Sequence, residues 1–283
     1  MNQPNLRPIT DPATDPIADS NPEPLKVEAR SLNFDGMLNV RDLGGLSLAD
    51  GSGVVDCGRL IRSASPQLLS EQGADQLYRY GVRTVVDLRT AGEQRNEGYG
   101  PLEEYYRDGR ITHLDAPLLS DAHWATDPVG TSAGLDDPAR HYISYLGDGQ
   151  TITRIASAVA ETAGNRSATM IHCAFGKDRT GVAIAVLLDA IGVEHSSIVT
   201  DYHATINHLP ALIERFRGAR SYFRDLGAPD PAAMAPQPLG ISGLLRWLDH
   251  THGGATGFLA GHGAGADVLV SLRRHLRYHR SVR

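Results

Sequence analysis

The chain has 283 residues, 41% of them hydrophobic and 21% charged, which is ordinary for a soluble globular protein. Its formal net charge of −6 disfavours a nucleic-acid partner, because a phosphate backbone binds basic surfaces. No apolar run reaches the roughly 18 residues of a transmembrane helix, so we expect no integral membrane protein. Two cysteines, Cys57 and Cys173, are too few for a disulfide framework, and the first residues lack the apolar core of a signal peptide. We expect a cytoplasmic protein, and export without a recognisable signal peptide stays open.

The N-terminal segment, residues 1–28, is crowded with proline and acidic residues. It can bury little apolar surface, so we expect it to be disordered. Residues 29–283 are expected to form a single domain. Within it, short alternating strands are predicted at Val54–Val55 and Leu60–Ile61.

The next elements follow from hydrophobic spacing. Pro66–Tyr80 is predicted to be a helix that Gly81 ends. The β-branched run Val82–Arg89 predicts a buried strand, and Ile111–Leu118 predicts another. The polar stretch Asp121–Asp137 is predicted to be a loop, of a length that often carries function.

The second half of the chain is richer in helix patterns. The predicted elements are a helix over Thr151–Ala163, a strand over Thr169–Cys173, and helices over Thr180–Ile191 and about Ser196–Asn207. They are followed by an amphipathic stripe at Leu209, Leu212, Ile213 and Phe216, a linker at Ala228–Pro238, and two or three glycine-broken helices over Leu239–Arg277. Strands alternating with helices, and then a helical tail, indicate one α/β domain.

The stretch His172–Gly181, HCAFGKDRTG, joins the predicted strand to the helix after it. Backbone amides in such a turn form an anion-binding nest, to which the helix N-terminus adds its dipole. Arg179 brings a planar fork that matches a phosphate. Cys173 lies at the base of the nest, where the positive surroundings favour a thiolate. The stretch therefore predicts a nucleophile and a tetrahedral-oxyanion cradle in one loop.

The order His-Cys, five residues, Arg-Thr-Gly and helix resembles the signature His-Cys-x5-Arg-Ser/Thr of the cysteine-dependent protein tyrosine phosphatases. The chain is most similar to the bacterial branch typified by mycobacterial tyrosine phosphatase B. Further motifs of that branch are matched by NVRDLGG at 39–45, GRLIRS at 58–63, VVDLRTAGE at 85–93 and DYHATIN from Asp201. The resemblance implies a central, mostly parallel sheet flanked by helices, a helical C-terminal part and a helical lid at about 205–228.

The reaction implied by this resemblance is phosphomonoester hydrolysis in two steps, without a metal or other cofactor. Cys173 attacks phosphorus to form a cysteinyl-phosphate, which water then hydrolyses. The implied phosphate-binding residues are Ala174, Phe175, Gly176, Lys177, Arg179, Thr180 and, from the first motif, Arg41. The implied substrates are phosphotyrosine proteins, with phosphoserine, phosphothreonine and phosphoinositides as further classes.

Two aspartates are candidates for the general acid, because neither tryptophan of the chain is followed by the usual Pro-Asp. The branch implies Asp178, within the loop; a nearby phosphate dianion and thiolate favour its protonated form. Asp87, at the C-terminal end of a predicted strand, is the other candidate, unless it anchors Arg89. Lys177 adds a second positive charge, as in lipid phosphatases, or offsets Asp178.

The remaining loop residues each have a functional and a structural interpretation. His172 is expected to orient the loop and to support an ionised Cys173, or to be a buried structural histidine. Thr180 donates a hydrogen bond to the sulfur or caps the helix. Arg41 braces the site or lies in a surface turn. Phe175 replaces an alanine of the branch, and it either packs away from the pocket or narrows it.

Other patterns are weaker. The string DHTHGG at 249–254 resembles a metal cluster, but a helix end with glycine as C-cap is favoured, and no metal is predicted. Two competing functions stay open: an inactive phosphate-binding module, and a sulfurtransferase that carries a persulfide on Cys173. The oligomeric state is also left open.

Overall fold

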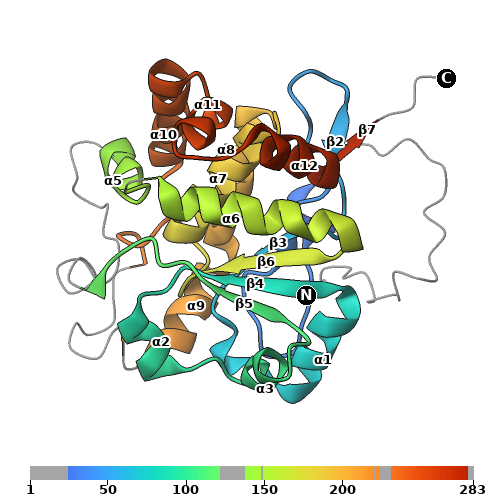
Figure 1. The fold of residues 1–283 in the computed structure, drawn as a ribbon. Coiled ribbons are helices and arrows are strands. Elements are labelled where there is room, and N and C mark those ends of the chain that lie inside the picture. The colour runs from blue at the N-terminus through green and yellow to red at the C-terminus, as the bar shows by residue number, and fades with distance from the viewer. Residues whose placement is uncertain (1–24, 122–137, 148, 220, 223–230, 280–283) are drawn as a thin grey trace.

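The computed structural model describes residues 25–121, 138–147, 149–219, 221–222 and 231–279. A five-stranded sheet organises these residues, with the strand order β1-β3-β6-β4-β5 (Figure 1). Its strands are β1 (Arg41–Asp42), β3 (Leu60–Ser63), β4 (Val82–Asp87), β5 (Thr112–Asp115) and β6 (Ala168–His172). β1 pairs antiparallel with β3, and the other three pairings are parallel. The mostly parallel sheet expected from the sequence is confirmed.

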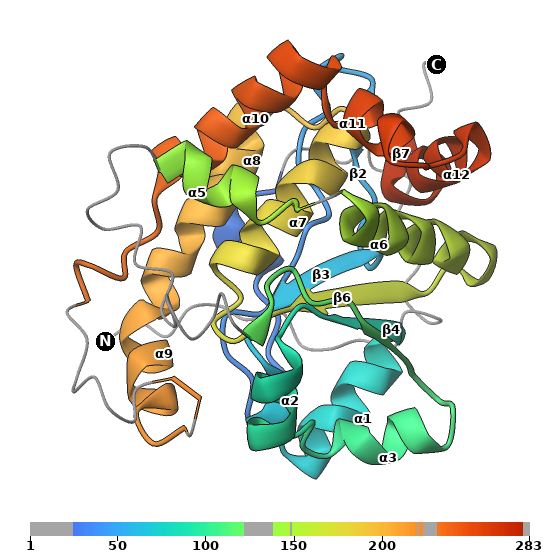
Figure 2. The ribbon, with the colours of Figure 1, turned by 60° about the vertical axis from the view of Figure 1, so that its left-hand side comes forward.

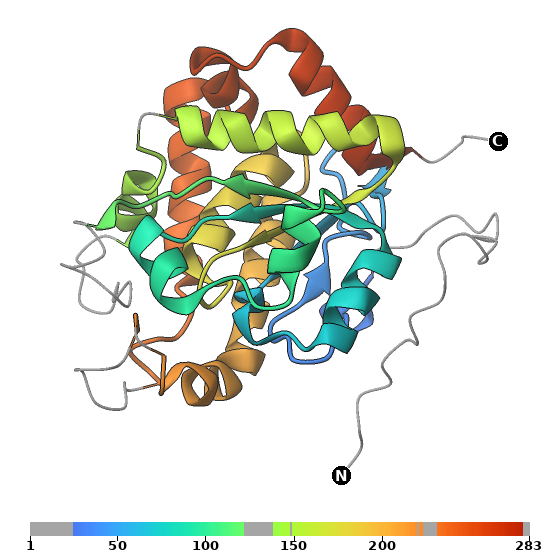
Figure 3. The same ribbon diagram turned by 60° about the horizontal axis from the view of Figure 1, so that its bottom comes forward.

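Helices cover both faces of this sheet (Figures 1 and 3). One face carries α1 (Glu71–Tyr80), α2 (Ala91–Glu97) and α3 (Leu102–Arg107). The other face carries α6 (Gln150–Glu161) and α7 (Asp178–Ala190), with α5 (Pro138–Ser144) and α8 (His195–His203) beside them. Each face has its own apolar core, because β-branched and leucine side chains of the buried strands point alternately to the two sides.

The C-terminal part is helical, as predicted. It consists of α10 (Pro238–His252), α11 (Ala255–Gly261) and α12 (Ala266–Leu276), which pack over α6, α7 and α8. The chain then forms β7 (Arg277–His279), which pairs with β2 (Gly53–Val55) in a small second sheet. Among the described residues, no helix has the length and apolarity needed to cross a membrane.

Several predicted boundaries differ from the structure. The expected helix Pro66–Tyr80 is a 3-10 turn followed by α1, because the Ser70 side chain accepts a hydrogen bond from the Gly73 N–H and so caps a new helix start. Gly81 ends α1 with φ +107°, as predicted. The short helices α2, α3 and α5 were not predicted, since each has fewer than eight residues and a weak periodic signal.

Some expectations fall on residues that the structure leaves undescribed. The segment 1–28 is described only from residue 25, where a 3-10 turn covers Val27–Arg30. The loop predicted over Asp121–Asp137 lies outside the described residues from 122 onward. The linker predicted over Ala228–Pro238 is described from 231, and α10 begins at its last residue.

Candidate active site at the phosphate loop

The loop Cys173–Lys177 leaves the carboxyl end of β6 and leads into α7, in the centre of the parallel strands (Figure 2). The last residues of β3 and β4, Ser63 and Asp87, are in register with His172, so both neighbouring strands end beside the loop. Cys173 is 2% exposed. α7 begins two residues earlier than predicted, at Asp178.

Carbonyl groups of the loop are held from outside it. The hydrogen bonds run from Ser65 N to Ala174 O (2.8 Å), from Asn39 Nδ2 to Phe175 O (2.9 Å) and from Arg62 Nη2 to Gly176 O (2.8 Å). Gly176 has φ +65°, and a Cβ there would lie 2.2 Å from the Ser63 carbonyl oxygen, so only glycine fits. Because the N–H of a peptide group points opposite to its carbonyl, this arrangement directs loop amides towards the loop centre.

A buried ionic cluster lies behind these contacts. Asp201 pairs with Arg30 (2.8 Å), Arg41 (3.0 Å) and Arg62 (2.8 Å), and all four side chains are 1% exposed. Burial alone would raise the pKa of Asp201, but the three guanidinium groups outweigh it and hold that pKa well below its usual range. Burial lowers the pKa of Arg41 to about 10, so Arg41 stays charged at neutral pH. Arg41 therefore occupies a bracing position behind the loop.

Arg179 is fixed by a carboxylate that the sequence analysis did not identify. Its Nη1 and Nη2 donate to Glu93 Oε2 (2.6 Å) and Oε1 (2.9 Å), and both side chains are buried. Burial would lower the pKa of Arg179, but Glu93 outweighs it and raises that pKa. Glu93 also closes a capping box with Thr90 at the start of α2. The Thr-x-x-Glu pattern was visible in the sequence, but the pattern does not say which cation the glutamate holds.

Asp87 and His172 form a second buried polar group beside the loop. Asp87 is 0% exposed, and the Arg89 guanidinium donates to it at 2.7 Å from Nη2. Burial would raise the pKa of Asp87, but His172, His113 and Arg89 together lower it. The pKa of His172 is lowered to about 4, mainly by burial, although Asp87 opposes the shift. His172 is therefore neutral at neutral pH, and its Nδ1 contacts Cys173 O at 3.2 Å.

Asp178 lies at the edge of the loop with 13% of its side chain exposed. Tyr142 Oη donates to its Oδ1 at 2.7 Å, and Lys177 Nζ lies 3.4 Å from its Oδ2. The same lysine ammonium donates to the Met234 carbonyl at 2.6 Å. The Lys177 ammonium thus connects Asp178 to the segment before α10.

Aromatic side chains cover the loop. The Phe175 ring contacts Phe216, at the end of α9 (Leu209–Phe216), with centroids 4.8 Å apart, and Tyr222 at 6.1 Å. Phe216 and Tyr222 meet edge to face at 5.0 Å. Of the two interpretations of Phe175, the structure matches packing against a helix. We refer to Phe175, Phe216 and Tyr222 as the aromatic cover.

Thr180 has an unused hydroxyl. The N-cap of α7 is Lys177, so the capping role considered for Thr180 is wrong. Its Oγ1 is buried and has no hydrogen-bond partner among the described residues. A buried hydroxyl without a partner calls for an explanation, and this one makes no hydrogen bond to the Cys173 sulfur in this structure.

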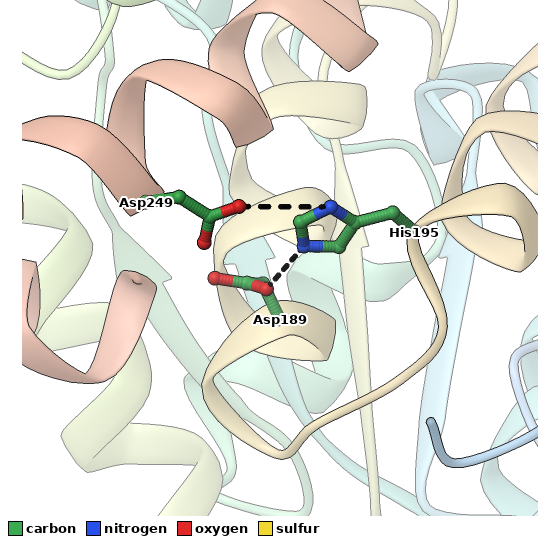
Figure 4. A group of neighbouring side chains, drawn as sticks. All are labelled: Asp189, His195 and Asp249. Carbon is green, nitrogen blue, oxygen red and sulfur yellow. Dashed lines mark hydrogen bonds and ion pairs between the residues drawn. The ribbon is translucent and has the colours of Figure 1, made fainter. Parts of the chain in front are cut away.

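One group of side chains in the described residues has the spacing of a metal site, and it lies away from the loop: Asp189, His195 and Asp249 (Figure 4). His195 Nε2 contacts Asp189 Oδ1 at 2.7 Å, and the other oxygen of Asp189 accepts the Ala255 N–H at the start of α11. These bonds tie helices together. The DHTHGG string ends α10 at Gly253, which has φ +70° and donates to Asp249 O, so the helix-end interpretation is confirmed.

Comparisons with known proteins agree on one family. A family model described as the tyrosine phosphatase family matches residues 32–278. A protein of Cupriavidus necator named as a tyrosine-protein phosphatase is 35% identical over 186 residues, covering 64% of this chain and 65% of the relative. The triple specificity protein phosphatase PtpB of Mycobacterium tuberculosis is 27% identical over 277 residues, covering 84% of this chain and 96% of the relative.

Among solved structures, kinase associated phosphatase with a serine in place of its catalytic cysteine matches with a TM-score of 0.35 and 16% identity, over 75% of this chain and 95% of that chain. The family match is independent of this likeness and covers most of the chain, including the phosphate loop. The chain therefore belongs to the tyrosine phosphatase family, and its enzyme class is protein tyrosine phosphatase.

Proposed function

We propose that the chain hydrolyses phosphomonoesters through a cysteinyl-phosphate on Cys173, with phosphotyrosine proteins as its principal substrates. The observation that carries this proposal is the arrangement of the loop around Cys173. Its carbonyls are held outward by Asn39, Arg62 and Ser65, and Arg179 is fixed by Glu93. Amides and a guanidinium so placed stabilise the equatorial oxygens of a transferring phosphoryl group.

The two steps balance within this site. In the first, the Cys173 thiolate forms an S–P bond while the P–O bond to the leaving group breaks, and that oxygen takes a proton from the general acid. In the second, water attacks phosphorus and gives a proton to the same carboxylate, and the S–P bond breaks to release inorganic phosphate and the thiolate. The Thr180 hydroxyl, buried and unpaired among the described residues, donates to the departing sulfur.

We propose Asp178 as the general acid in preference to Asp87. Asp87 is fully buried and held by Arg89, and its lowered pKa keeps it ionised at neutral pH. Such a group has no proton to give, so it serves as an anchor. Asp178 is partly exposed at the start of α7, directly after the loop, and we expect it to reach a substrate oxygen there.

We propose that α9 is a lid, within the segment expected at about 205–228. The lid is supported by the ring contacts of Phe216, the last residue of α9, and of Tyr222 with Phe175, two residues after a Cys173 that is 2% exposed. We expect a substrate to reach the sulfur when this packing opens. Rings beside the loop suit a phenyl phosphate, since aromatic pairs favour offset or edge-to-face contact. We expect limited proteolysis to cut near α9, and vanadate to protect it.

The test is hydrolysis of para-nitrophenyl phosphate by the wild type and by Cys173→Ser, with and without EDTA. We expect activity that persists in EDTA, because the nucleophile and the anion contacts all come from the protein, and we expect none in Cys173→Ser. No hydrolysis by the wild type, together with vanadate binding, would indicate a phosphate-binding module. Thiosulfate-to-cyanide sulfur transfer without hydrolysis would indicate a sulfurtransferase.

A substrate panel refines the proposal. Phosphotyrosine, phosphoserine and phosphothreonine peptides are assayed beside vesicles that contain phosphoinositides. We expect the phosphotyrosine peptides to give the highest kcat/KM. In this structure Lys177 is bound to the Met234 carbonyl, so a fixed lysine contact to an inositol phosphate requires that bond to break. If phosphoinositides gave the highest kcat/KM instead, they would be the principal substrates and the proposed preference for phosphotyrosine would be wrong.

A further inference from the structure

Two buried tyrosines contact the carboxylate that we propose as the general acid. Tyr142 Oη, from α5, donates to Asp178 Oδ1 at 2.7 Å, and Tyr202 Oη, from α8, lies 3.4 Å from the same oxygen. The two phenol oxygens are 2.5 Å apart. The rings are 0% and 1% exposed. The Gln237 N–H, one residue before α10, donates to Tyr202 Oη at 2.9 Å.

Two neighbouring helices have a glycine where each of these rings packs against them. A Cβ on Gly181, in α7, would lie 2.7 Å from Tyr202 Cδ2. A Cβ on Gly240, in α10, would lie 2.6 Å from Tyr142 Cε2. Each ring therefore crosses a helix at a glycine, at a distance that any side chain would prevent. Gly181 is the last residue of the HCAFGKDRTG motif, so the motif itself makes room for one of the tyrosines.

The direction of the hydrogen bonds follows from the donors available. The Gln237 N–H can only donate, and an ionised Asp178 can only accept. Tyr142 has one hydroxyl proton and donates it to Asp178 Oδ1 over the shorter distance, 2.7 Å against 3.4 Å from Tyr202. At the 2.5 Å contact between the phenols, Tyr142 therefore accepts from Tyr202. Burial, and then the charge of Asp178, raise the pKa of both phenols, so both keep the protons that this chain of bonds needs.

The two oxygens of Asp178 consequently differ. Oδ1 is occupied by Tyr142, whereas Oδ2 lies 3.4 Å from Lys177 Nζ on a side chain that is 13% exposed. A carboxylic acid that transfers a proton must present one defined oxygen to the leaving group, because misplacement of about 1 Å costs about a hundredfold in rate.

We propose that Tyr142 and Tyr202 are positioning residues that hold Asp178 by Oδ1, so that Oδ2 carries the proton of the reaction. The inference rests on the proposed role of Asp178. In the first step the proton leaves Oδ2 for the leaving-group oxygen as its bond to phosphorus breaks. In the second step Oδ2 takes a proton from the attacking water as the S–P bond breaks. Both tyrosines keep their own protons throughout.

The test uses Tyr142→Phe and Tyr202→Phe in the full chain, assayed with aryl phosphates of poor and good leaving groups. The readout is kcat/KM, which covers the steps up to formation of the cysteinyl-phosphate. We expect Tyr142→Phe to lower kcat/KM about tenfold for phenyl phosphate and less than about twofold for a dinitrophenyl phosphate, since a good leaving group needs no proton. Tyr202→Phe is expected to show the same pattern with a smaller loss, because its contact with Asp178 is longer.

The matched control is Tyr145→Phe. The Tyr145 hydroxyl is buried just after α5 but contacts His141 Nε2 at 2.7 Å. Its removal is expected to leave the leaving-group dependence unchanged. In an Asp178→Asn background, Tyr142→Phe is expected to have no further effect on kcat/KM.

The outcomes separate the two proposals. If Asp178→Asn lowers kcat/KM equally for both leaving groups, Asp178 is not the acid and the proposed function loses that step. If Asp178→Asn shows the expected selectivity but neither tyrosine variant does, only the positioning proposal fails. A loss in Tyr142→Phe that adds fully to that of Asp178→Asn also overturns it.

Discussion

The two sides of the phosphate loop are built from different interactions. Behind it lies the ionic cluster, in which one carboxylate, Asp201, is shared by three guanidinium groups at 2.8 to 3.0 Å. In front lies the aromatic cover, whose rings meet at 4.8 to 6.1 Å. Charge-assisted hydrogen bonds are directional and fix atoms, whereas ring packing tolerates shifts. The ionic cluster therefore fixes the geometry of the loop, and the aromatic cover is where we propose that access to the loop is controlled.

This difference also separates stability from reactivity. Removing one partner of a buried ion pair leaves an uncompensated charge in a low-dielectric interior. Removing one ring contact leaves apolar surface that solvent and neighbours can cover. Substitutions behind the loop should thus act on the whole fold, and substitutions in front should act on the local opening of α9.

The largest effect is expected from Asp201→Asn. It leaves Arg30, Arg41 and Arg62 buried together without a counter-charge, and we expect the free energy of unfolding to fall by roughly 3 to 5 kcal/mol. Urea denaturation measures it. The control is Asp75→Asn, because Asp75 pairs with Arg79 at 2.6 Å in an exposed i,i+4 bridge. Its loss should stay below about 1 kcal/mol. If both variants lost the same free energy of unfolding, the ionic cluster around Asp201 would not stabilise the fold more than an exposed ion pair does.

The next effect is a pH dependence of stability from His172. Its folded pKa of about 4 lies below the ordinary value of 6.5, so between these values the unfolded state binds the proton and the folded state does not. Stability is therefore highest above pH 6.5 and falls as the pH drops towards 4, by up to about 3 kcal/mol from this group. His172→Gln should flatten that slope. An unchanged slope would show that His172 is not neutral behind the loop.

A smaller loss, about a hundredfold in kcat/KM, is expected for Glu93→Gln. The amide cannot hold Arg179 by two charge-assisted bonds, so the guanidinium shifts relative to the phosphoryl oxygens. The control is Glu97→Gln in the same helix, whose carboxylate accepts hydrogen bonds from the Ser221 N–H and from Gln67 Nε2. Hydrolysis of para-nitrophenyl phosphate measures both. If Glu93→Gln were as active as the control, Glu93 would not be needed to hold Arg179 for catalysis.

The smallest effect is expected for Phe175→Leu, which keeps an apolar side chain but loses the ring contacts. The cost is about 1 kcal/mol. It should appear as faster alkylation of Cys173 by iodoacetate rather than as a lower urea midpoint. Phe34→Leu is the control, because Phe34 has a similar edge contact with Tyr80 at 5.7 Å in a core away from the loop. If both variants speed alkylation equally, the aromatic cover does not control access.

Much of the site was predictable because its signals are local. One short stretch of sequence encodes the strand, the Cys-x5-Arg spacing and the helix that follows. Within it, the φ of +65° at Gly176 requires a glycine. Gly81 and Gly253 end helices for a similar reason. Backbone conformation depends on side chains a few residues away, so a single sequence carries this information.

The partners of these residues were not predictable. Glu93 is 86 positions from Arg179, and Asp201 is 139 to 171 positions from the arginines that it binds. The spacing of a motif says nothing about which distant side chain the fold brings to it.

The amino-acid sequence alone thus predicted a nucleophile and an anion-binding loop and indicated the family, and the family is confirmed. Only the tertiary structure decided that Glu93 holds Arg179, that Asp87 is buried and paired with Arg89, that Phe175 packs against α9 and that two tyrosines contact Asp178. The physical reason is the separation along the chain over which each interaction acts. Turn and helix propensities act over a few residues, whereas ion pairing and ring packing depend on which distant segments the fold places in contact.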